Sequence, residues 1–152
     1  MFAIVLPAGS GKSTLATKHE YLVDIDALHT QEFKTNLWLP YYTEARQTGD
    51  WEKYDAYECD WLRPRLAAFT PQHVLLVHSV QKAERLGLTV LGVWKTSRAV
   101  MERVAAERHD DQGIVAHNWD SLPTAQILDT HADIECAVLE ACQKAGIMNA
   151  VT

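Results

Sequence analysis

The stretch MFAIVLPAGSGKS, residues 1–13, decides the fold of this chain. Its first part is an apolar run typical of a buried strand, and the run ends in a turn that holds Gly9 and Gly11. Helix-forming residues follow the turn at once, so the stretch predicts a strand, a glycine turn and the start of a helix. Such a turn directs successive backbone N–H groups toward one point, where a polyphosphate can bind and Lys12 can neutralise it.

The turn resembles the phosphate-binding loop of P-loop NTPases, G-x-x-x-x-G-K-[ST], with one departure. Leu6 stands where that motif has its first glycine, and we expect Pro7 to set the turn instead, because proline fixes φ. The resemblance implies that Lys12 contacts the β- and γ-phosphates of ATP and that the Ser13 hydroxyl ligates Mg²⁺. It also implies a set of phosphate-binding residues, namely Gly9, Ser10, Gly11, Lys12, Ser13 and Thr14.

A second strand pattern, residues 21–25, follows a helix of only about two turns and leads to Asp24 and Asp26. Ligands of open parallel sheets bind beyond the carboxyl ends of the strands, so we expect both carboxylates beside the glycine turn. Residues two apart on a strand point the same way, and the pair can therefore share a hydrated Mg²⁺ and a substrate hydroxyl. The alternative is that Asp26 only caps a helix that begins at Ala27.

Glycine turn, short helix and a second strand that ends in Asp24-Ile25-Asp26 together resemble the shikimate kinase and nucleoside-monophosphate kinase group of P-loop kinases. The resemblance implies one domain over residues 1–152, with an α/β/α three-layer fold and a five-stranded parallel sheet in the order 2-3-1-4-5. It implies further that Asp24 supports Mg²⁺, that Asp26 meets the acceptor, and that residues of about 30–72 bind the substrate.

This substrate segment predicts helices at about 29–38 and 50–62, with a loop between them and Asp50 as an N-cap. Pro64 is expected to break or kink the second helix, or to begin a new one. Six aromatic residues supply either a stacking surface for a base or ordinary core: Tyr41, Tyr42, Trp51, Tyr54, Tyr57 and Trp61. Three arginines are candidates for gripping an acceptor phosphate: Arg46, Arg63 and Arg65.

The continuous apolar run 73–79 predicts a strand buried in the middle of the sheet. Many P-loop NTPases end this strand in an acidic residue that helps to hold Mg²⁺, whereas this run ends in His78-Ser79. The resemblance therefore shifts the metal role toward Asp24 or Asp26 and counts against a motor-type or GTPase-type enzyme. His78 either reaches the bound phosphates or substrate, or is satisfied by neighbouring backbone.

Residues 88–94 predict a fourth strand, and Ser97 is expected to cap the helix that follows. The resemblance implies a lid over ATP at about 106–119, with Arg108 on phosphate as a catalytic residue and Arg103 on the base or lid. The alternative is that both arginines are solvated. Residues 125–130 resemble the fifth strand of the same kinases, whose end and following loop hold adenine, and Thr130 is expected to cap a closing helix.

Composition sets limits on the rest. No run of about 18 apolar residues occurs and no basic leader precedes the first strand, so we expect a soluble, cytoplasmic protein without membrane contact. The net charge of −6 gives no general attraction to nucleic acid. Three cysteines without C-x-x-C spacing are expected to be small buried thiols: Cys59, Cys136 and Cys142.

Together these features predict an ATP- and Mg²⁺-dependent kinase that phosphorylates a small acceptor, most simply a nucleoside or nucleotide. One alternative keeps the chemistry and makes a polynucleotide 5′-end the acceptor. A second alternative is a nucleotide-binding or slowly hydrolysing module that has no acceptor. The sequence leaves the oligomeric state open.

Overall fold

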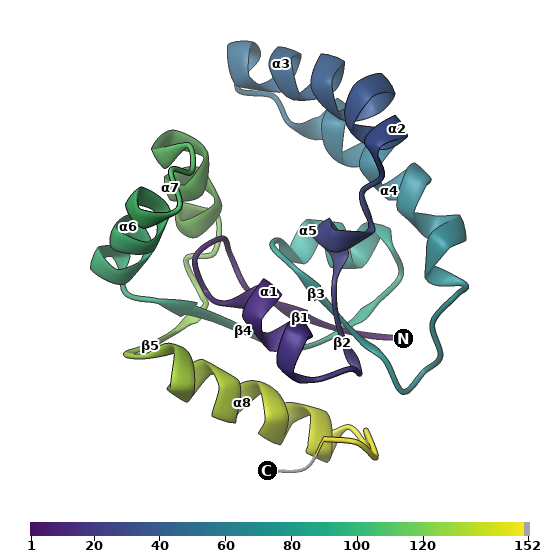
Figure 1. The fold of residues 1–152 in the computed structure, drawn as a ribbon, viewed down its shortest axis with the longest axis vertical. Helices are drawn as coiled ribbons and strands as arrows, with labels where there is room; N and C mark the ends of the chain where they lie inside the picture. The colour runs from purple at the N-terminus through teal and green to yellow at the C-terminus, as the bar shows by residue number, and fades with distance from the viewer. Residues whose placement is uncertain (151–152) are drawn as a thin grey trace.

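The computed structural model describes residues 1–150, apart from the side chains of residues 37 and 38. All pairs of neighbouring strands are parallel, and the sheet order β2-β3-β1-β4-β5 confirms the predicted order 2-3-1-4-5 (Figure 1). The strands are β1 (Phe2–Val5), β2 (Leu22–Asp24), β3 (Val74–Val77), β4 (Thr89–Thr96) and β5 (Gln126–Leu128).

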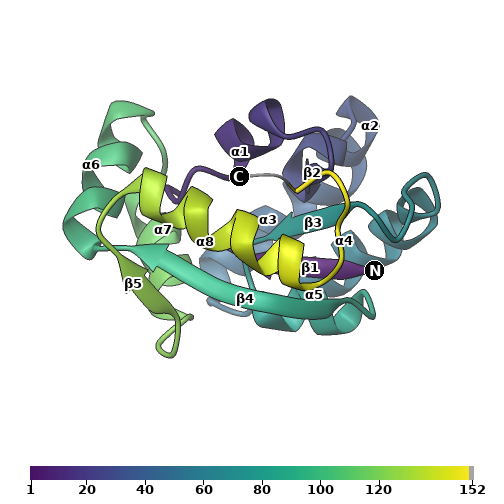
Figure 2. The same cartoon turned by 90° about the horizontal axis from the view of Figure 1, so that it is seen from below.

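Helices cover both faces of the sheet and build an extension above its carboxyl ends (Figures 1 and 2). A 3-10 helix η1 and a π-helical turn η2 occur among the α-helices. The helical elements are α1 (Lys12–Lys18), η1 (Ile25–Leu28), α2 (Gln31–Phe33), η2 (Lys34–Trp38), α3 (Leu39–Thr48), α4 (Glu52–Leu66), α5 (Val80–Arg85), α6 (Arg98–Glu107), α7 (Gln112–Asp120) and α8 (His131–Lys144).

The alternating side chains of β1 separate two layers of core. Ile4 and Leu6 pack on the face that α1 and α8 cover, whereas Ala3 and Val5 pack on the face that α4 and α5 cover. All four side chains are fully buried, as expected for a strand in the middle of a parallel sheet. The core therefore holds β1 rigidly at the point where the glycine turn leaves it.

The carboxyl ends of three neighbouring strands bring the predicted site residues to one edge. The glycine turn follows β1, η1 follows β2, and His78 follows β3. Above this edge stand the arm, which we define as α2 to α4, and the helix pair α6 and α7 (Figure 1). Arg46 of the arm joins the two, because its Nη2 lies 2.6 Å from Oδ2 of Asp111 at the start of α7.

One expectation for the arm is wrong, and a second is decided in part, because Pro64 neither ends helix α4 nor begins a new one. The loop predicted between about 39 and 49 is helix α3, and Pro40 follows directly on the π-helical turn η2, where the Leu39 N–H bonds to the Lys34 carbonyl five residues back instead of continuing the regular α-helical pattern. Helix α4 continues through Pro64 to Leu66, so no new helix begins at the proline. Only two helical residues follow Pro64, and the Arg65 guanidinium donates to the Trp61 carbonyl in the same last turn, over 2.8 Å.

The expected helix caps are partly confirmed. Ser97 caps α6 and Thr130 caps α8, each through a side-chain oxygen that accepts a backbone N–H three residues later. Trp51, and not Asp50, is the N-cap of α4, although Asp50 Oδ1 still accepts from the Glu52 N–H over 3.0 Å. Most of the segment predicted as a lid is helical, because Asp111 caps helix α7.

Two of the three cysteines match the prediction. Cys59 and Cys142 are buried free thiols, and burial raises the pKa of each to about 11. Cys136 is exposed, because it lies off the buried stripe of α8 that Ile134 and Val138 define. Within residues 1–150, no helix combines the length and apolar character needed to cross a membrane.

Two isoleucines on strands test the assignment of the core. Ile4 is fully buried in β1, whereas Ile127 on β5 is 50% exposed. We expect Ile4→Ala to lower the free energy of unfolding by about 2–5 kcal/mol through lost burial and the cavity left behind. Ile127→Ala, the matched control, should cost less than about 1 kcal/mol. Urea unfolding of both variants measures this, and equal losses would contradict the layer assignment.

Candidate functional site

The loop between β1 and α1 has the conformation that its glycines allow. Gly9 and Gly11 have φ angles of 83° and 88°, in the left-handed region that side chains rarely adopt. Leu6 extends β1 where the motif has glycine, since its N–H donates to the Val77 carbonyl over 2.8 Å. The turn then begins at Pro7, whose carbonyl accepts from the Ser10 N–H over 3.2 Å.

The interior of the loop contains an unpaired polar group and one unexpected neighbour. Ser10 is buried, and its hydroxyl has no hydrogen-bond partner within residues 1–150. His131, the first residue of α8, lies with Nε2 2.9 Å from the Gly9 carbonyl oxygen. His131 was missed in the sequence, where only its position after the Thr130 cap sets it apart.

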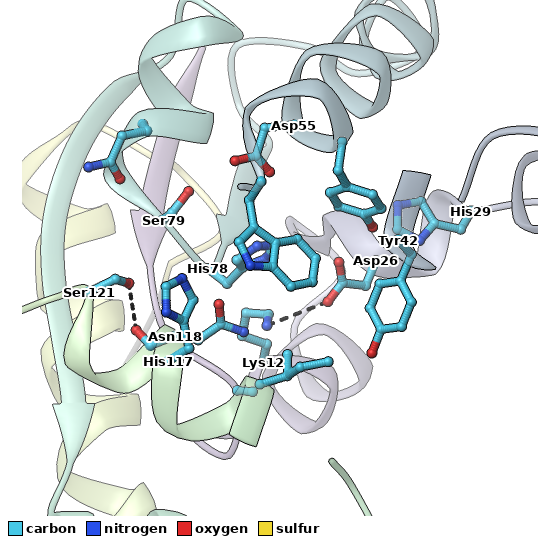
Figure 3. A pocket seen from close by; sticks show the side chains of 15 residues that line it. Lys12, Asp26, His29, Tyr42, Asp55, His78, Ser79, His117, Asn118 and Ser121 are labelled. Atoms are coloured by element: carbon cyan, nitrogen blue, oxygen red, sulfur yellow. Dashed lines mark hydrogen bonds and ion pairs between the residues drawn. The ribbon is translucent and has the colours of Figure 1, made fainter. Parts of the chain in front are cut away.

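Lys12 lies at the boundary between two cavities of about 420 and 400 Å³. We call the first the aromatic cavity and the second the loop cavity. Lys12 is 8% exposed, and its Nζ lies 3.6 Å from Oδ2 of Asp26 (Figure 3). The two cavities share part of their lining, namely Ala8, Lys12, Asp26, Tyr42, Ile114 and Asn118.

The two aspartates differ in exposure and in task. Asp24 is buried and caps η1, with Oδ1 accepting from the Asp26 N–H over 3.1 Å. A capping aspartate is therefore present at this turn, but it is Asp24 and not Asp26, whose own N–H is the capped group. The Asp26 side chain is 46% exposed and lines both cavities, which leaves it accessible to a ligand.

The pKa values of these two aspartates shift in opposite directions. Burial raises the pKa of Asp24, and the charge of Lys12 offsets this only in part. Burial opposes the ionisation of Asp26 as well, but the positive charges of Lys12 and Lys82 outweigh it and lower the pKa of that carboxyl group. Asp26 is thus an ionised acceptor of hydrogen bonds at neutral pH.

The structure places the two lid arginines in different surroundings. Arg108 lines the loop cavity, and it also lines a third cavity of about 440 Å³ with Ser13 and His131. Its Nε lies 3.5 Å from Oδ2 of Asp110. Arg103 is 66% exposed, its Nε lies 3.9 Å from Oε1 of Glu107, and it lines none of these three cavities.

Three of the six aromatic candidates line the aromatic cavity, namely Tyr42, Trp51 and Tyr54. Their rings meet edge to face, with centroids 5.6–6.2 Å apart. Trp51 also stacks on His117 of α7, with centroids 6.4 Å apart. The arm and the helix pair therefore contribute opposite walls of one cavity.

The other candidates of the arm lie elsewhere. Tyr41 and Tyr57 stack on each other, and Trp61 packs against Phe33. Among the residues that the structure describes, no arginine lines the aromatic cavity. The three arginines proposed for an acceptor phosphate instead bond within the arm or to other helices: Arg46 to Asp111, Arg63 to Asp60 and the Arg85 carbonyl, and Arg65 to the Trp61 carbonyl.

A buried polar cluster closes the inner end of the aromatic cavity. Glu58 of α4 forms an ion pair with Lys82 of α5, and their side chains are 2% and 0% exposed. The Tyr54 hydroxyl donates to Glu58 Oε2 over 3.0 Å, and His29 Nε2 lies 3.1 Å from the same oxygen. Lys82 Nζ also lies 3.1 Å from Nε2 of His78.

Burial and the charges within this cluster determine which of its members are ionised at neutral pH. Burial opposes ionisation of Glu58, but Lys82 and the contact from His29 lower its pKa well below the usual range. Burial, reinforced by the charge of Lys82, lowers the pKa of His78 to about 3. Glu58 is therefore an anion and His78 a neutral ring at pH 7.

Two groups of side chains have the donors for a metal ion. Ser13 and Asp24 line the loop cavity together with Lys12 and offer hard oxygen ligands, which Mg²⁺ prefers. Asp26, His29 and Glu58 bring donor atoms within 4.8 Å of one another. In the second group, Glu58 already forms an ion pair with the Lys82 ammonium, which would repel a metal ion. We therefore favour Ser13 and Asp24 as the metal ligands.

Sequence reasoning missed three polar residues that line the aromatic cavity, namely His29, His117 and Asn118, and the buried pair Glu58 and Lys82 beside it. Tyr54 and Glu58 are four residues apart, as are His78 and Lys82, and this spacing places each pair on one side of a helix or its N-terminal turn. Nothing in the sequence indicates that the two pairs meet.

Comparison with known proteins identifies the fold. No model of a known protein family matches the chain, and no curated protein does. A sugar kinase from Janibacter sp. HTCC2649, solved without ligand, superposes with a TM-score of 0.56 at 15% identity, over 99% of this chain and 98% of that one. A gluconokinase from Sinorhizobium meliloti 1021 also gives 0.56, at 14% identity, over 95% and 91% of the two chains.

These similarities and the sheet order show the fold of the P-loop kinases, in the arrangement of the shikimate kinase and nucleoside-monophosphate kinase group. The fold predicted from the glycine turn and the Asp24-Ile25-Asp26 strand end is thus confirmed.

The neutral state of His78 predicts a loss of stability in mild acid. The unfolded chain binds a proton at this histidine below about pH 6.5, whereas the folded chain binds it only near pH 3. The stabilisation is therefore complete above pH 6.5 and declines as the pH falls, by on the order of 2 kcal/mol at pH 5. Urea unfolding at pH 7 and pH 5 measures it.

The control for this prediction is His78→Gln, which has no titrating ring. Glu58 loses its contribution only below about pH 4.3, the pKa of a free glutamate, so it does not interfere above pH 5. The same decline in the variant as in the wild type would show that His78 is not the source.

Proposed function

We propose that this protein is an ATP- and Mg²⁺-dependent kinase that transfers a phosphoryl group to a hydroxyl of a small acceptor. The observation that carries the proposal is the position of Lys12 and Asp26 between the loop cavity and the aromatic cavity, with Lys12 Nζ 3.6 Å from Asp26 Oδ2. Phosphoryl transfer needs mainly positioning and charge neutralisation, and it needs donor and acceptor to meet at one point. The shared edge of the two cavities is such a point.

The loop side has features that suit a triphosphate. Gly9 and Gly11 adopt backbone angles that expose amide groups, and the buried Ser10 hydroxyl lacks a protein partner. Lys12 brings a positive charge to the loop cavity, and Arg108 approaches it from α6. We assign Lys12 and Arg108 to the transferred phosphoryl group and the loop residues through Thr14 to the remaining phosphates.

The oxygen donors Ser13 and Asp24 fit Mg²⁺ and would hold it on the loop side. When bound, the ion neutralises phosphate charge and orients the phosphates. The raised pKa of Asp24 suits this role, because a buried carboxylate without a cation carries an electrostatic cost that a cation removes. Arg103 is left on the surface, and its contact with the base stays a prediction.

On the acceptor side, Asp26 would accept a hydrogen bond from the attacking hydroxyl and direct its oxygen toward the loop. A carboxylate with a lowered pKa is a weak base, so Asp26 would mainly orient the hydroxyl and take up its proton late. Tyr42, Trp51 and Tyr54 offer aromatic surface for an apolar face of the acceptor.

The charges of the aromatic cavity favour an acceptor without a phosphate group. Two acidic side chains, Asp26 and Asp55, line it, and its basic residue, Lys12, is the one that we assign to the transferred phosphoryl group; no arginine of the described chain lines it. A nucleoside fits the aromatic wall better than a nucleotide for this reason. A neutral sugar is the second candidate, supported by the fold neighbour that is named as a sugar kinase.

The two other functions have less support. A polynucleotide 5′-end brings several phosphates, and neither the lining of the aromatic cavity nor the net charge of −6 attracts them. A hydrolysing module without an acceptor would have no use for a second cavity with an ionised carboxylate at its base. Both alternatives are outcomes of the tests below.

Nucleotide binding is tested by thermal unfolding. ATP or ADP with Mg²⁺ at millimolar concentration should raise the Tm, because a ligand that binds only the folded chain stabilises it by mass action. Lys12→Ala should remove most of this shift. Lys144→Ala, on the exposed end of α8, is the matched control and should keep it. No shift in the wild type would exclude the nucleotide site.

Acceptor transfer is tested by ADP release in a panel of adenosine, thymidine, cytidine, AMP, D-glucose, D-gluconate and a 5′-hydroxyl oligothymidylate. We expect release above the acceptor-free rate with a nucleoside or neutral sugar. Asp26→Asn should reduce that release by at least about 100-fold while the Tm shift with MgADP persists, because general acid–base groups contribute factors of about 10²–10⁴.

Three results in this panel speak against the proposal. Equal release in every well, with or without a compound, would indicate a hydrolysing module. Release with the oligonucleotide alone would support the 5′-end kinase. Full transfer by Asp26→Asn would remove Asp26 from catalysis.

A further inference from the structure

His78 has a fixed partner on one ring nitrogen and also lines a cavity. It follows the last residue of β3, is partly buried, and lines the aromatic cavity with Asp26 (Figure 3). Its Nε2 lies 3.1 Å from Nζ of Lys82. The residue thus contacts a buried lysine and borders the space that an acceptor would occupy.

The lysine cannot accept a hydrogen bond from this ring. Lys82 is fully buried and is the ammonium partner of the Glu58 carboxylate in a buried ion pair. The Tyr54 hydroxyl and His29 hold the carboxylate in place from the other side. An ammonium group has three donors and no acceptor, so Nε2 of His78 must be the acceptor, and the proton of the neutral ring must be on Nδ1.

We propose that His78 donates a hydrogen bond from Nδ1–H to an oxygen of the acceptor, and that Glu58 and Lys82 are positioning residues that fix this tautomer. The identity of the acceptor rests on the proposed function, whereas the tautomer rests on the cluster alone. No group is transferred to or from His78 in this role.

In consequence, one hydroxyl of the acceptor would form hydrogen bonds with two residues. The hydroxyl oxygen accepts from His78 while its proton points to the carboxylate of Asp26, since both residues line the same cavity. The charged groups that act on the ring are Lys82 from α5, Asp26 from η1, Lys12 from α1 and Glu58 from α4. Burial, together with the charges of the two lysines, outweighs the two carboxylates and lowers the pKa of His78, so the neutral donor is present across the neutral range of pH.

The tautomer is tested without any ligand by long-range ¹H–¹⁵N correlation spectra of the labelled protein. We expect His78 to show a protonated Nδ1 and an unprotonated Nε2, unchanged between pH 8 and pH 5.5. In the double variant Glu58→Gln/Lys82→Met, which leaves no unpaired buried charge, the ring should titrate or show both tautomers. A protonated Nε2 in the wild type would overturn the tautomer, and identical spectra in both proteins would overturn the positioning role of Glu58 and Lys82.

The contact with the acceptor is tested by His78→Asn and His78→Gln, with the panel compound that the wild type phosphorylates fastest. The asparagine amide stands near Nδ1 and can still donate to the acceptor, whereas the glutamine amide stands near Nε2 and keeps the contact with Lys82. We expect kcat/KM to fall by about tenfold or more in His78→Gln, and by less than about threefold in His78→Asn.

The reverse order, with His78→Gln the more active variant, would show that His78 serves only the structural contact with Lys82. Equal losses in two folded variants would also overturn the proposed donor. If neither variant folds, the NMR spectra of the wild type with and without the same compound decide, because the contact requires the Nδ1–H signal to shift. A wild type inactive toward the whole panel would overturn the proposed function, and the acceptor contact with it, and would leave the tautomer to the spectra.

Discussion

The buried ion pair between Glu58 and Lys82 is the contact on which the arm and the site depend. One partner belongs to α4 of the arm and the other to α5, which packs on the sheet, so the pair connects the arm to the core. Loss of one partner would leave an uncompensated buried charge, which is among the costliest defects a fold can carry. The ion pair therefore helps to position the aromatic residues of the arm relative to the glycine turn.

The pair also explains why polar side chains are tolerated beneath the aromatic cavity. Tyr54, His29 and His78 each contact a member of it, so each finds a partner with a fixed charge. In a cluster of this kind every added partner makes the others less costly to bury. The same charges separate the two carboxylates at its edge, because Asp26 is lowered in pKa by nearby cations while Asp24 lies in a more buried position.

The sequence was sufficient for features that depend on local pattern. The apolar run before Pro7, the glycines after it and the carboxylates at the end of β2 are short-range signals, and parallel strands bring their carboxyl ends together. It was insufficient where distant segments meet. Glu58 and Lys82 are far apart in the chain, and the pattern at 39–48 does not predict its helix because Pro40 and two tyrosines weaken the helical periodicity.

The placement of the basic side chains gives the site a direction. Lys12 lines both cavities, whereas Arg108 lines the loop cavity and no arginine of the described chain lines the aromatic cavity. The loop cavity also contains acidic side chains, and Asp24 is the one that we assign to Mg²⁺. Under the proposed function, the phosphates of ATP would therefore meet two basic residues and the metal ion on the loop side, and the aromatic cavity beyond Lys12 would remain for an uncharged hydroxyl.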